Sequence, residues 1–95
     1  MVIGVLQLDL RLHGPQSLKQ KRGVINKLLA RCRNRFPASC AEIGHNELWQ
    51  RALLGFAVVS SSEQVVAPIL NRIEEELLTT GEVDLVNADT EFIHC

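Results

Sequence analysis

The most distinctive chemistry of this sequence is a run of cationic side chains between residues 17 and 36, with no carboxylate among them. Lysine and arginine bind phosphate oxygens, and such contacts position a protein on a nucleic acid without reading its sequence. These residues therefore favour a polyanionic partner. The candidate phosphate contacts are Lys19, Lys21, Arg22, Lys27, Arg31, Arg33 and Arg35, with Arg51 as an addition from later in the chain.

Trp49 is the only tryptophan and lies in a polar stretch close to His45 and Arg51. If its indole is exposed, it is a candidate stacking or interface anchor. The alternative is that it covers one end of the core and keeps only its edge in water. The sequence leaves both alternatives open.

Patterns typical of catalytic or metal sites are weak. The turn residues 13–16 precede Ser17, and free amides at a helix start can hold an anion. An acylphosphatase-like enzyme needs an arginine in that loop, however, and this loop has none. No serine or cysteine triad is discernible, so we expect a protein that is not an enzyme and uses no metal or cofactor. The spacing of the remaining metal-ligand types does not match a zinc site: Cys40, His45, His94 and Cys95.

Length and composition predict one domain spanning residues 1–95. The net charge of −1 hides a strong segregation, because residues 10–41 carry eight cations and no acid. Such asymmetry favours a polyanionic partner or self-association. No apolar run is long enough to span a membrane, and the N-terminus lacks the basic region of a signal peptide. With an odd number of cysteines and no CxxC motif, a cytoplasmic protein is the expectation.

Hydrophobic periodicity predicts six elements. Alternation with period two predicts a strand over residues 2–12, with Val5, Gln7, Asp9 and Arg11 on its outer face. Ser17 is the predicted N-cap of the basic helix, and Pro37 ends it. Further strands are expected at residues 38–45, 52–60 and 83–93, and a second helix between Ser60 and Gly81.

Each predicted helix has an apolar stripe. In the basic helix the stripe separates two cationic flanks, one with Lys19, Arg22 and Arg33 and the other with Lys27, Arg31 and Arg35. Lys19, Lys21 and Arg22 also lie near the positive end of the helix dipole, where each cation typically costs about 0.3–1 kcal/mol. The stripe residues are Leu18, Ile25, Leu28, Leu29, Cys32 and Phe36 in the basic helix, and Val65, Val66, Ile69, Leu70, Ile73 and Leu77 in the second.

The order β-α-β-β-α-β predicts a ferredoxin-like fold, in which two helices cover one face of a four-stranded antiparallel sheet. Strands one and three are expected in the centre. The uncovered sheet face is expected to mediate a homodimer. An RNA recognition motif is rejected, because the first strand has no aromatic residue and Phe56 is expected in the core.

Two groups of residues carry a resemblance to a known family. Ser17-Leu18-Lys19 followed by Lys21-Arg22, and the later segment 48–52 (LWQRA), resemble the YlxP-like family of small bacterial proteins, long described as a domain of unknown function. The resemblance extends over nearly the whole chain and implies a ferredoxin-like fold in a bacterial cytosolic protein. Genes of this family often lie near those of translation initiation and ribosome maturation factors, which implies an RNA or ribosome setting. The family brings no established catalytic residues.

Together these observations give a leading hypothesis and an alternative. The leading hypothesis is a non-enzymatic accessory protein that contacts structured RNA or the ribosome through its basic helix. The alternative is a homodimeric protein-interaction module that uses the open sheet face, with the basic helix docked on an acidic protein partner.

Overall fold

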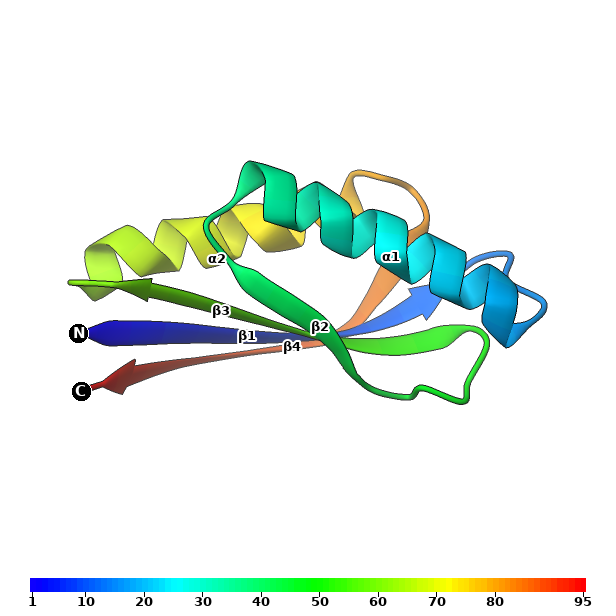
Figure 1. Ribbon diagram of the computed structural model, residues 1–95, viewed down its shortest axis with the longest axis horizontal. Helices are drawn as coiled ribbons and strands as arrows, with labels where there is room; N and C mark the ends of the chain where they lie inside the picture. Colours follow the sequence, from blue (N-terminus) through cyan, green and yellow to red (C-terminus); the bar gives the residue numbers. More distant parts are fainter.

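The architecture was taken from a computed structural model that describes residues 1–95. Its strands are β1 (Val2–Leu12), β2 (Ser39–Gly44), β3 (Arg51–Ser60) and β4 (Val83–His94), and its helices are α1 (Leu18–Arg35) and α2 (Glu63–Leu78). All strand pairs are antiparallel, in the order β2-β3-β1-β4. Both helices cover the same face of the sheet, and the chain termini lie together at one end (Figure 1). The predicted ferredoxin-like fold is confirmed, with β1 and β3 central.

Alternation along β1 separates the core face from the open face. Leu6, Leu8 and Leu10 are buried beneath the helices, and Phe56 packs among them from β3, as expected. The helices contribute Ile25, Leu28 and Cys32 from α1, and Val66, Leu70, Ile73 and Leu77 from α2. The alternating apolar residues of the strand and the apolar stripes of the helices therefore pack together in one core.

Helix α1 begins with a well-formed cap. The Ser17 hydroxyl accepts a hydrogen bond from the Gln20 amide at 3.1 Å, and the Gln20 side chain accepts one from the Gln16 amide at 2.8 Å. The first bond satisfies an amide that the helix itself leaves unpaired, and the second ties the residue before the cap to the first turn. Ser17 is thus confirmed as the N-cap.

The details of both helices differ from the predictions at their ends. Leu18 and Val65 belong to the predicted stripes, yet they are 37% and 50% exposed, because each lies in a first turn that extends past the core. Pro68 lies inside a continuous α2. That helix ends at Leu78 with Thr79 as its cap, whereas Gly81, the predicted C-terminal boundary, adopts a positive φ in the following turn.

The open face of the sheet carries the odd-numbered residues of β1 and their partners in register. None of the aromatic side chains is on this face of β1 or β3, which agrees with the rejection of an RNA recognition motif. At one end Ile3 lies between Val59 and Ile93, and the last two are 59% and 41% exposed. No helix is both long and apolar enough to cross a membrane.

Two glycines give a matched test of the packing. A Cβ at Gly4 would clash with Val66 Cγ1, because α2 packs closely on β1 there, whereas a Cβ at Gly23 in α1 meets nothing within 4 Å. We expect Gly4→Ala to lower the free energy of unfolding by about 1–3 kcal/mol through overpacking. Gly23→Ala is expected to raise it by about 0.5–1 kcal/mol through helix propensity. Urea denaturation measures both, and a neutral Gly4→Ala would contradict the close approach.

Candidate nucleic-acid interface

One cationic flank of α1 faces acidic side chains of α2 and the turn that follows it. Arg31 Nε lies 3.0 Å from Glu76 Oε1, Arg35 also contacts that oxygen, and Lys27 Nζ lies 3.5 Å from Glu82 Oε1. Glu76 is mostly buried, so its two arginine partners are held in place, while the exposed Lys27 pair is weaker. This flank therefore offers less positive charge to a ligand than the sequence indicated.

The predicted phosphate contact of Lys21 is wrong. This residue was predicted to contact phosphate from the surface, but it is only 2% exposed. Its ammonium donates a hydrogen bond to the His45 carbonyl at 2.7 Å and lies 2.8 Å from Glu42 Oε2. That carboxylate oxygen is not aligned for a hydrogen bond, so the contact with Glu42 is an ion pair by proximity. Lys21 cannot reach an external phosphate, and its role is structural.

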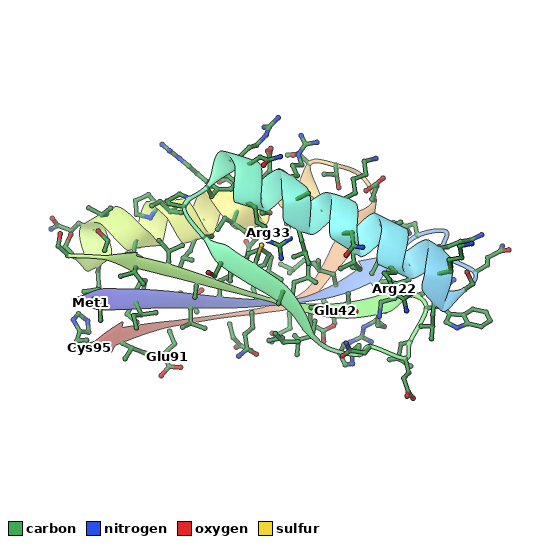
Figure 2. All side chains as sticks on the ribbon, in the orientation of Figure 1. Met1, Arg22, Arg33, Glu42, Glu91 and Cys95 are labelled. Atoms are coloured by element: carbon green, nitrogen blue, oxygen red, sulfur yellow. The ribbon has the colours of Figure 1, made fainter.

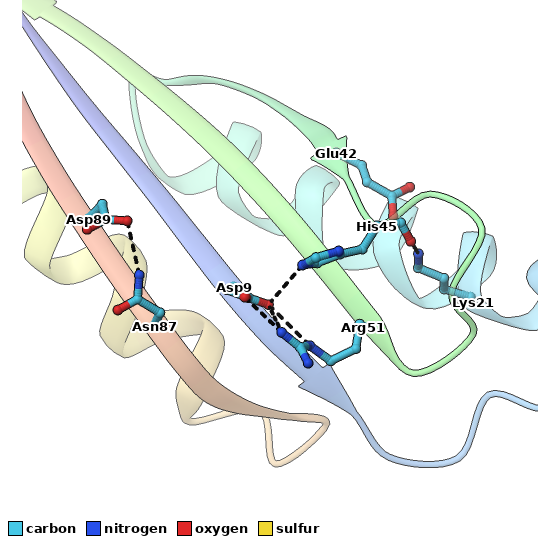
Figure 3. Close-up of polar contacts among 7 residues, drawn as sticks. All are labelled: Asp9, Lys21, Glu42, His45, Arg51, Asn87 and Asp89. Atoms are coloured by element: carbon cyan, nitrogen blue, oxygen red, sulfur yellow. Dashed lines mark hydrogen bonds and ion pairs between the residues drawn. The ribbon is translucent and has the colours of Figure 1, made fainter.

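Arg51 is likewise engaged within the protein. Its guanidinium makes a bidentate contact with Asp9, with Nη2 at 2.9 Å and 2.8 Å from the two carboxylate oxygens. His45 Nε2 approaches the same carboxylate at 3.4 Å (Figure 3). Because His45 also offers its carbonyl to Lys21, these contacts join α1, the β2–β3 loop and the open face of β1 and β3. Arg51 is thus part of an internal network, and the predicted phosphate contact at this residue is not supported.

The other flank of α1 keeps its charge available. Lys19, Arg22 and Arg33 are exposed and have no carboxylate partner. They lie within about 60° of one another around the helix axis. Arg33 donates one hydrogen bond to the Cys40 carbonyl at 2.7 Å, which directs this flank toward β2. Three of the predicted phosphate contacts thus remain together on one surface.

The position of this flank relative to β2 follows from two contacts. Arg33 reaches Cys40 near the start of β2, and Lys21 reaches His45 just after its end. Twelve residues of helix span about 18 Å and five of strand about 17 Å, so α1 runs alongside β2 in the opposite direction. Arg22, on the same flank as Arg33, therefore lies near the β2–β3 loop, and Figure 2 shows it on that side of α1.

The β2–β3 loop presents two unpartnered apolar side chains. Leu48 and Trp49 are 49% and 52% exposed, so the alternative in which Trp49 covers the core is not supported. The loop is nevertheless held at both ends, since Leu48 N donates to the His45 carbonyl at 3.0 Å and Leu12 N donates to the Gln50 carbonyl at 2.9 Å. We call the surface formed by Lys19, Arg22, Leu48 and Trp49 the loop-end surface.

The remaining candidate groups are dispersed. Burial raises the pKa of the Cys32 thiol to about 11 and also raises that of Cys40, so both thiols are unreactive. His13 pairs with Asp84 at 2.9 Å, and His94 pairs with Glu63 at 2.6 Å. No three histidine, cysteine, aspartate or glutamate side chains converge as a metal site.

The family described as "Protein of unknown function (DUF503)" matches residues 3–90. The chain belongs to this family. The uncharacterized protein YlxP of Bacillus subtilis (strain 168) is 33% identical over 91 residues, covering 96% of this chain and 99% of the relative. The predicted YlxP-like relationship is thereby confirmed.

A solved structure supports the fold alone. The structural genomics protein YJCS superposes with a TM-score of 0.58 at 7% sequence identity, and the match covers 97% of this chain and 99% of that one. The family is one of unknown function, and the likeness to YJCS shows the fold alone.

Lys21 offers a direct test of the internal network. We expect Lys21→Met to lower the free energy of unfolding by about 3 kcal/mol, because it leaves the Glu42 carboxylate and the His45 carbonyl without their shared cation. The matched control is Lys19→Met on the exposed flank, which should change stability by less than about 0.5 kcal/mol. Urea denaturation distinguishes them. Equal effects of the two substitutions would contradict the structural role of Lys21.

Proposed function

We propose that this DUF503 protein binds RNA, alone or within the ribosome, through the exposed flank of α1. The observation that carries the proposal is the group of three exposed cations, Lys19, Arg22 and Arg33, on a helix with no acidic residue to offset them. Phosphate contacts of this kind give affinity and orientation without sequence readout. The protein is expected to act as a non-enzymatic accessory factor.

Local energetics add support. Lys19 and Arg22 lie at the start of α1, where the helix dipole disfavours cations, and neither has an internal partner to compensate. Lys21 in the same turn does have such partners. Unfavourable local choices without a structural gain are concentrated at functional sites. A phosphate backbone would supply the missing counter-charge.

The test separates binding from stability. We expect Lys19→Glu/Arg22→Glu to abolish binding to ribosomal particles and to bulk cellular RNA at low salt. The same change should raise the free energy of unfolding by about 0.3–1 kcal/mol per site, since acids suit a helix start. Wild-type affinity should fall steeply with salt, with a log–log slope of roughly −0.7 to −0.9 per phosphate neutralised. Filter binding and urea denaturation measure the two effects.

A charge-matched control is available in the same chain. Arg11 and Arg72 are exposed and have no ion-pair partner, and they lie on β1 and α2 rather than on α1. Arg11→Glu/Arg72→Glu should therefore weaken binding far less. Reversal of Lys27, Arg31 and Arg35 is a poorer control, because it would place new carboxylates against Glu76 and Glu82. If both double variants lose binding equally, or if the wild type binds no RNA at low salt, the proposal is wrong.

A second candidate function is a homodimer formed through the open sheet face. The row of aliphatic side chains at Ile3, Val59 and Ile93 favours it, since two of the three are exposed on a flat strand surface. A groove beside this row is lined by Val5, Ala41, Ile43 and Ala57. A second copy would cover both.

Light scattering at micromolar concentration tests this candidate. We expect a dimer mass for the wild type and a monomer mass for Val59→Lys, because a charge in the centre of a buried apolar contact is costly. Val65→Lys is the matched control, since Val65 is a similarly exposed valine on α2 and outside the sheet face. A monomeric wild type, or dissociation by both variants, would contradict the dimer.

A further inference from the structure

We propose that Trp49 is a stacking platform for an unpaired RNA base, held beside the phosphate contacts of Lys19 and Arg22. This inference rests on the proposed RNA-binding function and specifies its substrate class. The ligand would be an RNA segment in which a single-stranded base lies next to a phosphate backbone, as in a loop or bulge. A fully paired duplex buries its bases and would use only the cations.

The first step is the exposure of the indole. Trp49 is 52% exposed, and the neighbouring Leu48 is 49% exposed. Large apolar side chains in a loop lose hydrophobic free energy unless a partner covers them. Every nucleobase has an aromatic face, so an exposed indole can stack on any of them.

The second step is the rigidity of the loop. His45 adopts a positive φ of 58°, and its carbonyl accepts hydrogen bonds from both Lys21 Nζ and Leu48 N. At the other end, the Gln50 carbonyl accepts from Leu12 N, and Arg51 is fixed by Asp9. Trp49 thus projects from a segment that is anchored on both sides. Because the loop is already ordered, Trp49 loses little conformational entropy when a ligand binds.

The third step is the charge around the indole. Arg22 lies on the flank of α1 that follows β2 to this loop (Figure 2). Lys19 shares that flank, since it lies within about 60° of Arg22 around the helix axis. Glu47 is the nearby acid in the loop, and it has no ion-pair partner. Two unpaired cations against one acid leave the loop-end surface positive. Stacking combined with backbone cations is the usual basis of single-strand recognition.

The tryptophan fluorescence of the protein reports on Trp49 alone, because the chain has no other tryptophan. The probes are an RNA hairpin with a loop of unpaired adenosines and a blunt duplex with the sequence of its stem. We expect the hairpin to quench the tryptophan emission and the duplex to leave it nearly unchanged. Trp49→Ala should bind the hairpin about tenfold more weakly and the duplex as wild type does. Trp49→Phe should restore most of the loss, since a phenyl ring also stacks.

The outcomes distinguish this inference from the function on which it rests. If Lys19→Glu/Arg22→Glu removes binding of both probes while Trp49→Ala binds the hairpin normally, RNA binding stands and the stacking inference is overturned. Unchanged emission on saturation with the hairpin overturns it as well, and assigns the exposed indole to a protein partner. If the charge variant still binds both probes, the proposed function itself fails. Circular dichroism verifies that each variant is folded.

Discussion

A lysine ammonium buried inside a 95-residue domain must find its counter-charge and its hydrogen-bond acceptor within the fold, because an unpaired interior charge is strongly destabilising. Lys21 finds both on one neighbouring segment, the Glu42 carboxylate on β2 and the His45 carbonyl just after it. These contacts fix the start of α1 against the end of β2. The left-handed backbone of His45 then turns its ring toward Asp9 on the open face. One buried cation thereby determines how a helix, an edge strand and the following loop are arranged.

The two helices differ in whether the unfavourable charges near their ends have compensating partners. Glu76 lies near the negative end of α2, where an acid is disfavoured, but Arg31 and Arg35 in the second half of α1 offset it. Arg35 is also favourable for the dipole of α1 itself, because it lies in the last turn of that helix. No equivalent exists at the start of α1, where Lys19 and Arg22 have no acidic neighbour. Packing of α1 on α2 therefore compensates the charge of Glu76, whereas Lys19 and Arg22 stay uncompensated and exposed to solvent.

The fold was predictable because strong periodicities determine it. The alternation of β1 and the stripes of both helices identified about two thirds of the core, and the chain order then favoured a single topology. The site was less predictable. Lys21 lies four residues before Ile25, inside the apolar stripe, and this spacing was a signal of burial that the count of cations obscured. The pairing of Arg31 with Glu76 and of Arg51 with Asp9 depends on helix packing and strand register, which local patterns do not specify.

The two segments that carry the DUF503 likeness, residues 17–22 and 48–52, contain two kinds of residue. Some make contacts that stabilise the fold, and others are exposed and make no such contacts. In the first segment Ser17 caps α1 and Lys21 is the buried cation. In the second, Arg51 pairs with Asp9 and Ala52 is fully buried. Among the residues left over are two cations, Lys19 and Arg22, and two exposed apolar side chains, Leu48 and Trp49, which make up the loop-end surface. Because α1 and β2 run side by side in opposite directions, the start of α1 and the β2–β3 loop, which carry these side chains, lie at the same end of the molecule (Figure 1). The exposed cations at the helix start and the exposed apolar side chains each carry a local free-energy cost. The proposed RNA ligand, which offers both charge and an aromatic face, would compensate both.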